Sequence, residues 1–171
     1  MSKIIDDLLL LSKAEAHDIK LNLEDVSLRD LVADVCVDMR IFAENKGIEL
    51  VVNEREDVKV KGDELKLRRM LWNILENGIK YTQKGGLVAV SSHMNNGYVA
   101  IHVKDNGAGI SQEDIKYIFD RFYRADRSRK RESGSGLGLS ISKWIAEAHN
   151  GSIEVQSKPF NGSLFSIKLP I

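Results

Sequence analysis

The chain has 171 residues, of which 43% are hydrophobic and 29% charged, a composition typical of a soluble globular protein with one core. Its 25 basic and 25 acidic side chains cancel to a formal net charge of zero, which argues against a nucleic-acid partner. No apolar run approaches a membrane span, and the single cysteine, Cys36, excludes an internal disulfide. We therefore expect a cytoplasmic protein.

The first helix is predicted over residues 2–16, with Ser2 as its candidate N-cap. Its apolar residues cover most of one side: Ile4, Ile5, Leu8, Leu9, Leu10 and Leu11. Such a helix needs a packing partner, which could be the core of the same domain or a helical bundle outside this chain. The polar segment 15–20 favours the bundle. We therefore divide the chain into 1–20, the end of a bundle, and 21–171, a separate domain.

A second helix is predicted over about 28–46, between Ser27 as N-cap and Gly47 as a left-handed C-cap. Helical spacing predicts its buried face: Leu28, Leu31, Val32, Val35, Met39 and Phe42. Cys36 lies beside that face, where packing is its expected role. Two short apolar runs, 48–52 and 58–60, are predicted strands.

A third helix, about 64–82, begins after Asp63 as N-cap and carries two stripes. The buried stripe is Leu67, Met70, Leu71, Ile74, Leu75 and Gly78; the adjoining polar stripe is Asn73, Asn77, Lys80 and Tyr81. Asparagine is a mediocre helix former, and Gly78 weakens the helix by about 1 kcal/mol relative to alanine. A helix that contains Asn73, Asn77 and Gly78 despite this cost is expected to carry a functional surface.

A β-hairpin follows, with strands over 87–94 and 98–104 joined by the turn Asn95-Asn96-Gly97. Val99, Ile101 and Val103 alternate, as in a half-buried strand, which ends in Asp105-Asn106-Gly107-Ala108-Gly109-Ile110. Glycines allow close approach of the backbone to a ligand, and Asp105 can accept a hydrogen bond from an amino group such as that of adenine. By itself, Asp-Asn-Gly after a strand is more often a plain turn.

The last third of the chain combines aromatic, basic and glycine-rich segments. Ser111 caps a short helix, followed by Phe119-Asp120-Arg121-Phe122-Tyr123-Arg124, the basic stretch 127–131 and Gly134-Ser135-Gly136-Leu137-Gly138-Leu139. The glycine run opens a helix that ends at 149–151, and strands over 153–156 and 164–169 form a closing hairpin. Backbone N–H groups at such a helix start suit a phosphate. The pattern is neither a Rossmann fingerprint nor a P-loop.

In this order, the motifs resemble those of the ATP-binding catalytic domain of sensor histidine kinases, in the superfamily shared with gyrase-type topoisomerases and heat-shock chaperone ATPases. They correspond to its N box (73–81), G1 box (105–109), F box (119–122) and G2 box (134–139). The resemblance runs from about Leu28 to the end. It implies an α+β fold: a two-layer α/β sandwich of a mixed sheet covered on one face by helices, here preceded by the short N-terminal helix.

The resemblance implies ATP and Mg²⁺ as cofactors. It assigns nucleotide binding to Asn77, Tyr81, Asp105, Gly107, Gly109, Ile110, Phe122, Gly134, Gly136, Leu137, Gly138 and Leu139, and catalysis to Asn73, Lys80 and Arg124. Asp105 would read the adenine amino group, Asn77 would bind Mg²⁺, and Lys80 and Arg124 would neutralise phosphate charge. Residues from about 123 to 135 would form a mobile ATP lid. Gly78 stands where the family commonly has alanine.

Asn73 marks a difference from the ATP-hydrolysing relatives, where the residue four before the Mg²⁺ asparagine is a glutamate that serves as general base. Asparagine cannot accept a proton, so transfer to a separate acceptor is favoured over hydrolysis. Two other hypotheses stay open. One is a nucleotide-binding regulatory module without turnover, against which Lys80 and Arg124 argue mildly. The other is an ATP-hydrolysing conformational clamp, against which Asn73 argues.

The chain's four histidines do not match the family's phosphoacceptor, which lies mid-helix before an acidic residue and Arg/Asn-Thr-Pro. His93 and His102 fall in predicted strands, His149 ends a helix where the helix dipole favours it, and His17-Asp18 has no Thr-Pro after it. We therefore expect a piece of a larger sensor kinase. Its partners would be the phosphoacceptor helical bundle and a response regulator receiver domain. The parent would be a homodimeric membrane sensor with this domain on the cytoplasmic side.

Overall fold

The computed structural model describes residues 3–16, 18–53, 57–125 and 134–171. Within these ranges the helices are α1 (Lys3–Glu15), α2 (Leu28–Lys46), α3 (Glu64–Tyr81), α4 (Gln112–Ile115) and α5 (Gly138–Ala148). The strands are β1 (Glu24–Ser27), β2 (Glu49–Asn53), β3 (Lys59–Gly62), β4 (Leu87–Asn95), β5 (Tyr98–Asp105), β6 (Ser152–Ser157) and β7 (Ser163–Pro170). The ranges that the structure describes include no helix with the length and hydropathy that a membrane span requires.

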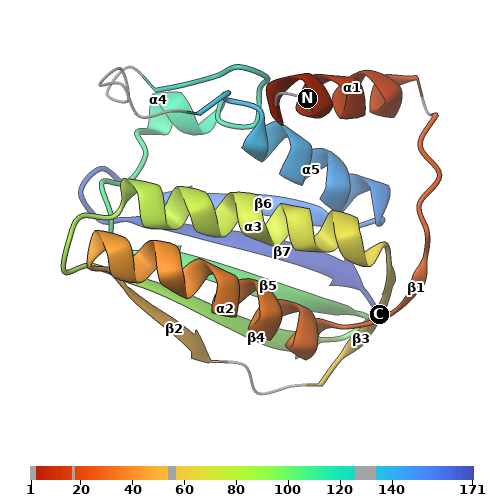
Figure 1. The fold of residues 1–171 in the computed structure, drawn as a ribbon, viewed down its shortest axis with the longest axis horizontal. Coiled ribbons are helices and arrows are strands. Elements are labelled where there is room, and N and C mark those ends of the chain that lie inside the picture. The colour runs from red at the N-terminus through yellow and green to blue at the C-terminus, as the bar shows by residue number, and fades with distance from the viewer. Residues whose placement is uncertain (1–2, 17, 54–56, 126–133) are drawn as a thin grey trace.

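The main sheet has five strands in the order β2-β4-β5-β7-β6, with β2 and β4 parallel and the other neighbours antiparallel. Helices α2, α3 and α5 cover one face of this sheet (Figure 1). The α+β fold predicted from the sequence, a mixed sheet with helices on one face, is therefore confirmed. A separate two-stranded ribbon, β1 with β3, was not predicted.

Successive side chains of β5 point to opposite faces of the sheet, so every second one packs against the helices. Val99, Ile101 and Val103 are fully buried under the helical layer, as predicted. Asp105 follows at the same spacing, so its side chain points to the helical side, whereas His102 belongs to the opposite, open face. The strand thus delivers a carboxylate to the helical layer at its last residue.

Helix α3 lies between α2 and α5 and forms the centre of the helical layer. At its start, Asp63 Oδ1 accepts a hydrogen bond from the backbone N–H of Lys66 at 3.1 Å, which confirms the predicted N-cap. At its end, the Lys46 ammonium donates to the carbonyl oxygens of Ile79, at 3.0 Å, and Lys80. A cation at this position offsets the negative end of the helix dipole. Both ends of the functional helix are therefore fixed.

Helix α2 confirms Ser27 as N-cap and Gly47, with φ of 70°, as left-handed C-cap, but one predicted buried position is wrong. Phe42 is 53% exposed and packs edge-on against Trp72 of α3, with ring centroids 5.8 Å apart. The buried face advances by four residues from Met39 to Ala43, which leaves Phe42 rotated toward solvent. Cys36 belongs to the buried face itself.

His149 is the C-cap residue of α5, which confirms its predicted place at the end of a helix. Its Nε2 accepts from the backbone N–H of Asp63 at 2.9 Å, so this nitrogen carries no proton. Its Nδ1 then donates to the Ile145 carbonyl at 2.7 Å. His149 is thus a buried link between the end of α5 and the N-cap of α3.

Helix α1 packs one face on the rest of the chain and exposes another. Leu11 and Asp7 are both 3% exposed, and the Asp7 carboxylate pairs with Arg69 of α3. At the other end of α1, Glu15 pairs with Arg121 at 2.7 Å. The adjoining side exposes Ile4, Ile5, Leu8 and Leu9. Part of this helix therefore belongs to the core of the chain, and its exposed apolar row remains open to a further helix.

Replacing Gly78 by alanine should stabilise the protein. A Cβ at this position would lie 3.5 Å from Val88 Cγ1 and 4.0 Å from Asp105 Cβ, both ordinary van der Waals distances. Removing glycine from the interior of α3 should therefore raise the free energy of unfolding by about 1 kcal/mol, measured by denaturant unfolding. Gly151→Ala is the control: its Cβ would overlap the backbone carbonyl oxygen of Lys168, so it should destabilise. A Gly78→Ala variant less stable than the parent would contradict this packing.

Candidate nucleotide-binding site

The four motif segments predicted from the sequence meet at one end of the helical layer. The backbone N–H of Ala108, in the loop after β5, donates to the Tyr81 carbonyl at the end of α3, at 3.1 Å. The Asn73 side-chain amide donates to the Gly138 carbonyl at the start of α5, also at 3.1 Å. The structure thus joins the N box to both glycine-rich segments through hydrogen bonds.

The aromatic segment joins the second glycine-rich segment in the same way. The backbone N–H of Phe122 donates to the Gly136 carbonyl at 3.0 Å, and Phe122 has a φ of 61°. A Cβ on Gly136 would lie 2.8 Å from the Phe122 carbonyl carbon, so no larger residue fits there. Phe122 itself is 57% exposed. Its backbone, more than its ring, therefore shapes this part of the site.

Asp105 is a buried carboxylate at the end of β5, only 6% exposed. Burial raises its pKa, while hydrogen bonds from the backbone N–H groups of Gly107 and Ser163 act in the opposite direction. The Gly107 bond to Oδ1 is 2.8 Å long. These donors hold the carboxylate in one orientation. It can still accept further hydrogen bonds, because a carboxylate has about four lone-pair sites.

The glycines after Asp105 serve packing of the backbone against other segments of this chain. A Cβ on Gly107 would lie 2.5 Å from the Tyr81 carbonyl oxygen, and one on Gly109, at φ 67°, would overlap the Lys158 carbonyl oxygen. Ile110, half-buried, donates its N–H to Ser157 Oγ at 2.8 Å. The expected reason for these glycines was approach to a ligand. The structure shows that contacts within the protein already require them.

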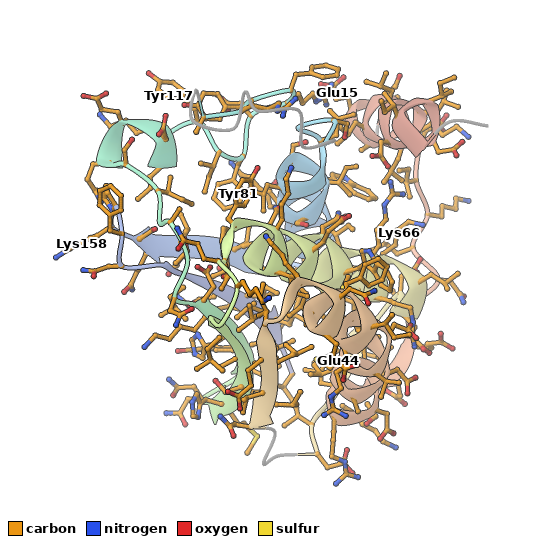
Figure 2. The ribbon with its side chains drawn as sticks, turned by 60° about the vertical axis from the view of Figure 1, so that its left-hand side comes forward. Glu15, Glu44, Lys66, Tyr81, Tyr117 and Lys158 are labelled. Carbon is orange, nitrogen blue, oxygen red and sulfur yellow. The ribbon has the colours of Figure 1, made fainter. Side chains whose placement is uncertain are left out.

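Lys80 extends across the gap between α3 and the second glycine-rich segment. Its Nζ lies 5.1 Å from the centre of the Tyr81 ring and 3.1 Å from where a Cβ on Gly134 would be. Figure 2 labels Lys66 near the start of α3 and Tyr81 at the opposite end of this helix. An ammonium group therefore stands at the meeting point of the N and G2 boxes, where an anion could bind.

The start of α5 offers backbone donors to the same place. Leu137, fully buried, anchors this start, and the helix has no side-chain cap at its N-terminus. Gly138 and half-buried Leu139 form its first turn. Unpaired N–H groups at a helix N-terminus bind anions, and the helix dipole adds positive potential. Together with Lys80, this arrangement fits phosphate groups.

Two further predicted residues, Asn77 and Arg124, are less buried than Asp105 and Asn73. Asn77 is half-buried, one turn after Asn73 on α3. Arg124 is exposed, and the predicted lid, 123–135, falls mostly on residues 126–133, which lie outside the described residues together with the basic stretch 127–131. The structure therefore places Asn77 on the predicted polar stripe but does not describe the lid.

Sequence reasoning missed two serines beside Asp105. Ser163, 8% exposed, lies directly opposite Asp105 on β7. Its hydroxyl is 3.0 Å from that of Ser157, which also contacts the G1 loop through Ile110. Only the register of β5 with β7 reveals this neighbour, since 58 positions separate Asp105 from Ser163 in the sequence. The available signal was a serine directly before the predicted closing strand 164–169.

Comparisons with known proteins agree with this geometry. The family described as histidine kinase-, DNA gyrase B- and HSP90-like ATPase matches residues 62–171. The sensor-like histidine kinase SenX3 of Mycobacterium tuberculosis (strain H37Rv) is 35% identical over 171 residues, 99% of this chain and 42% of SenX3. The chain thus spans less than half of this relative.

Solved structures give the same result. Full-length ShkA in complex with AMPPNP superposes with a TM-score of 0.85 at 28% identity, covering 98% of this chain and 35% of ShkA. The catalytic domain of histidine kinase ThkA gives a TM-score of 0.78 at 26% identity, covering 88% of this chain and 96% of ThkA. The chain therefore belongs to the histidine kinase-, DNA gyrase B- and HSP90-like ATPase family, as an ATP-binding catalytic domain of the sensor histidine kinase type.

Proposed function

We propose that this domain binds Mg-ATP and directs the γ-phosphoryl group to a histidine outside the 171 residues. The proposal rests on one observation: hydrogen bonds bring α3, the loop after β5 and the start of α5 together into one site. A buried, oriented acceptor, Asp105, lies at one side. Lys80 and the uncapped start of α5 lie at the other. An acceptor and a set of donors at opposite sides match the adenine amino group and the phosphates of one nucleotide.

Each predicted residue has a proposed role in this site. Bound Mg-ATP would supply the phosphoryl group and a cation that offsets its charge. Asn77 offers an amide oxygen to the metal, and Lys80 and Arg124 face the phosphates with positive charge. Tyr81 and Ile110 line the nucleotide, and the glycine segments offer backbone N–H groups. These residues bind and orient, so the chemistry depends on an acceptor brought in line.

Asn73 supports transfer over hydrolysis. Its amide N–H already donates to the Gly138 carbonyl, and an amide cannot accept a proton from water. The side chain therefore orders the start of α5 and provides no general base. This argues against the conformational clamp. The regulatory module without turnover remains the alternative, and a measured transfer reaction would exclude it.

The proposed parent protein is larger than this chain. We infer that residues 1–20 are the end of a dimerising, phosphoacceptor helical bundle and that 21–171 form the catalytic domain. The exposed row Ile4, Ile5, Leu8 and Leu9 supports this division, because such a row is suited to helix packing. A response regulator receiver domain would be the next acceptor. The parent would be a homodimeric membrane sensor with this domain on the cytoplasmic side.

Replacing Asn77 by alanine tests the metal assignment. The variant should bind an ATP analogue roughly tenfold more weakly with Mg²⁺ present, equivalent to about 1.4 kcal/mol, because a metal ligand is lost. With EDTA the difference from the parent should shrink, because the adenine contacts are unchanged. Calorimetric titration measures both. Asn45→Ala, at an exposed position of α2, is the matched control and should change neither value. The same defect in both conditions would place Asn77 away from the metal.

A further inference from the structure

Two histidines lie side by side on the open face of the sheet, away from the nucleotide site. His93 of β4 pairs with Ala100, and His102 of β5 pairs with Ser91, so the two histidines are diagonal neighbours on the same face. Their ring centroids are 5.6 Å apart, with planes inclined by 50°. The helices cover the opposite face (Figure 1). Nothing in the nucleotide site uses this pair.

The His102 ring is fixed from the neighbouring strand. Its Nδ1 lies 2.9 Å from Ser166 Oγ, and Ser166 is the residue directly opposite on β7. Histidines that bind metals usually make such a hydrogen bond through the nitrogen that does not bind, because it fixes the tautomer and the ring orientation. With Nδ1 on the β7 side, Nε2 is the nitrogen available to a metal ion.

The spacing of the rings suits a tetrahedral ion. Metal–nitrogen bonds of about 2.0–2.1 Å at a tetrahedral angle would put two imidazole centroids about 5.2 Å apart. A square-planar angle would put them about 4.5 Å apart. The observed 5.6 Å is nearer the tetrahedral value. We propose that His93 and His102 form a two-histidine site for a divalent transition-metal ion of the zinc type on the open face of the sheet.

The charges around the pair are compatible with a cation. Burial lowers the pKa of His102, and the neighbouring His93 and Lys168 lower it further. The Lys168 ammonium is paired with Glu154 at 2.9 Å, which offsets its charge. Among the described residues no third histidine, cysteine or carboxylate joins the pair. Water would therefore complete the coordination, and we expect binding weaker than at a four-ligand site.

Calorimetric titration of the 171-residue chain with ZnCl₂, at pH 7.5 and without nucleotide, tests the proposal. The parent should bind one ion, and each single variant, His93→Gln or His102→Gln, should bind at least about tenfold more weakly because the chelate is lost. The double variant should bind none. Ser166→Ala should give an intermediate loss, because the ring is no longer held. His17→Gln is the matched control and should leave zinc binding unchanged.

Binding of an ATP analogue checks that the variants are folded. It should be unchanged in His93→Gln, which alters an exposed side chain, and in the double variant, because both rings lie on the face opposite Asp105. Equal zinc affinity in the parent and the double variant would overturn the proposal, as would a parent that shows no binding at millimolar zinc. Neither result affects the proposed nucleotide site.

Discussion

Replacing Asp105 by asparagine should weaken binding of an ATP analogue roughly ten- to a hundredfold, through the loss of about 1.5–3 kcal/mol for a charge-assisted hydrogen bond. The carboxylate is buried and held by the Gly107 N–H at 2.8 Å. An amide of the same shape would present an N–H₂ group where an acceptor is needed, so an adenine amino group would face a donor. Calorimetric titration of both forms measures the difference.

Although it should bind nucleotide more weakly, Asp105→Asn should not lower the stability of the free protein at pH 7. Burial raises the pKa of Asp105, so the folded state binds more protons than the unfolded state between the unfolded and folded pKa values. Stability contributed by this group is therefore present below the unfolded pKa and falls as pH rises through the folded value. At pH 7 the ionised carboxylate destabilises the free protein, and the neutral amide removes this effect.

Thermal unfolding from pH 4 to 8 therefore separates binding from folding. Asp105→Asn should be at least as stable as the parent at pH 7, with the advantage shrinking toward pH 4. Asp25→Asn, in an exposed ion pair with Lys61, is the matched control and should leave nucleotide affinity unchanged. Equal nucleotide affinity in the parent and Asp105→Asn would mean that Asp105 does not read adenine.

Elements with local signals could be predicted from the sequence. The caps Ser27, Asp63 and Gly47 act within a few residues, so the local sequence was enough to predict α2 and α3. The turn Asn95-Asn96-Gly97 likewise fixed the β4–β5 hairpin. The ribbon of β1 with β3 was missed because β1 has four residues and a polar pattern, and its partner lies across the whole of α2.

The segments that meet at the candidate site could be predicted from residue type, but the contacts between them could not. The site roles of Asn73, Asp105 and the glycine segments stay predictions, and the reasons for their geometry come from pairings between distant segments. Phe122 with Gly136, and Asp105 with Ser163, meet only because the chain folds back on itself. Phe42 was misplaced because helical periodicity does not determine where a buried stripe drifts after three turns. Local periodicity therefore predicts which face of a helix or strand is buried. The contacts between distant residues depend on how the strands and helices pair in the fold.

The largest expected effect is the dependence of phosphoryl transfer on an added acceptor. Incubated with γ-labelled ATP, the 171-residue chain should acquire no label on histidine. His149 is 4% exposed and hydrogen-bonded at both ring nitrogens, and His93 and His102 lie on the face of the sheet opposite Asp105. Release of free phosphate should also be slow, because Asn73 cannot accept a proton from water.

Adding a separately produced phosphoacceptor bundle of the proposed parent kinase should change this result from no label to an acid-labile label on the bundle. The nucleotide would already be oriented by Asp105, Lys80 and the start of α5, so transfer requires only a nucleophile brought in line. Asn77→Ala with the same bundle is the control and should give much less label, because the proposed metal ligand is lost. An acid-labile label on His17 of the chain alone, a residue outside the described ranges, would make the fragment a self-contained kinase and contradict this division of roles.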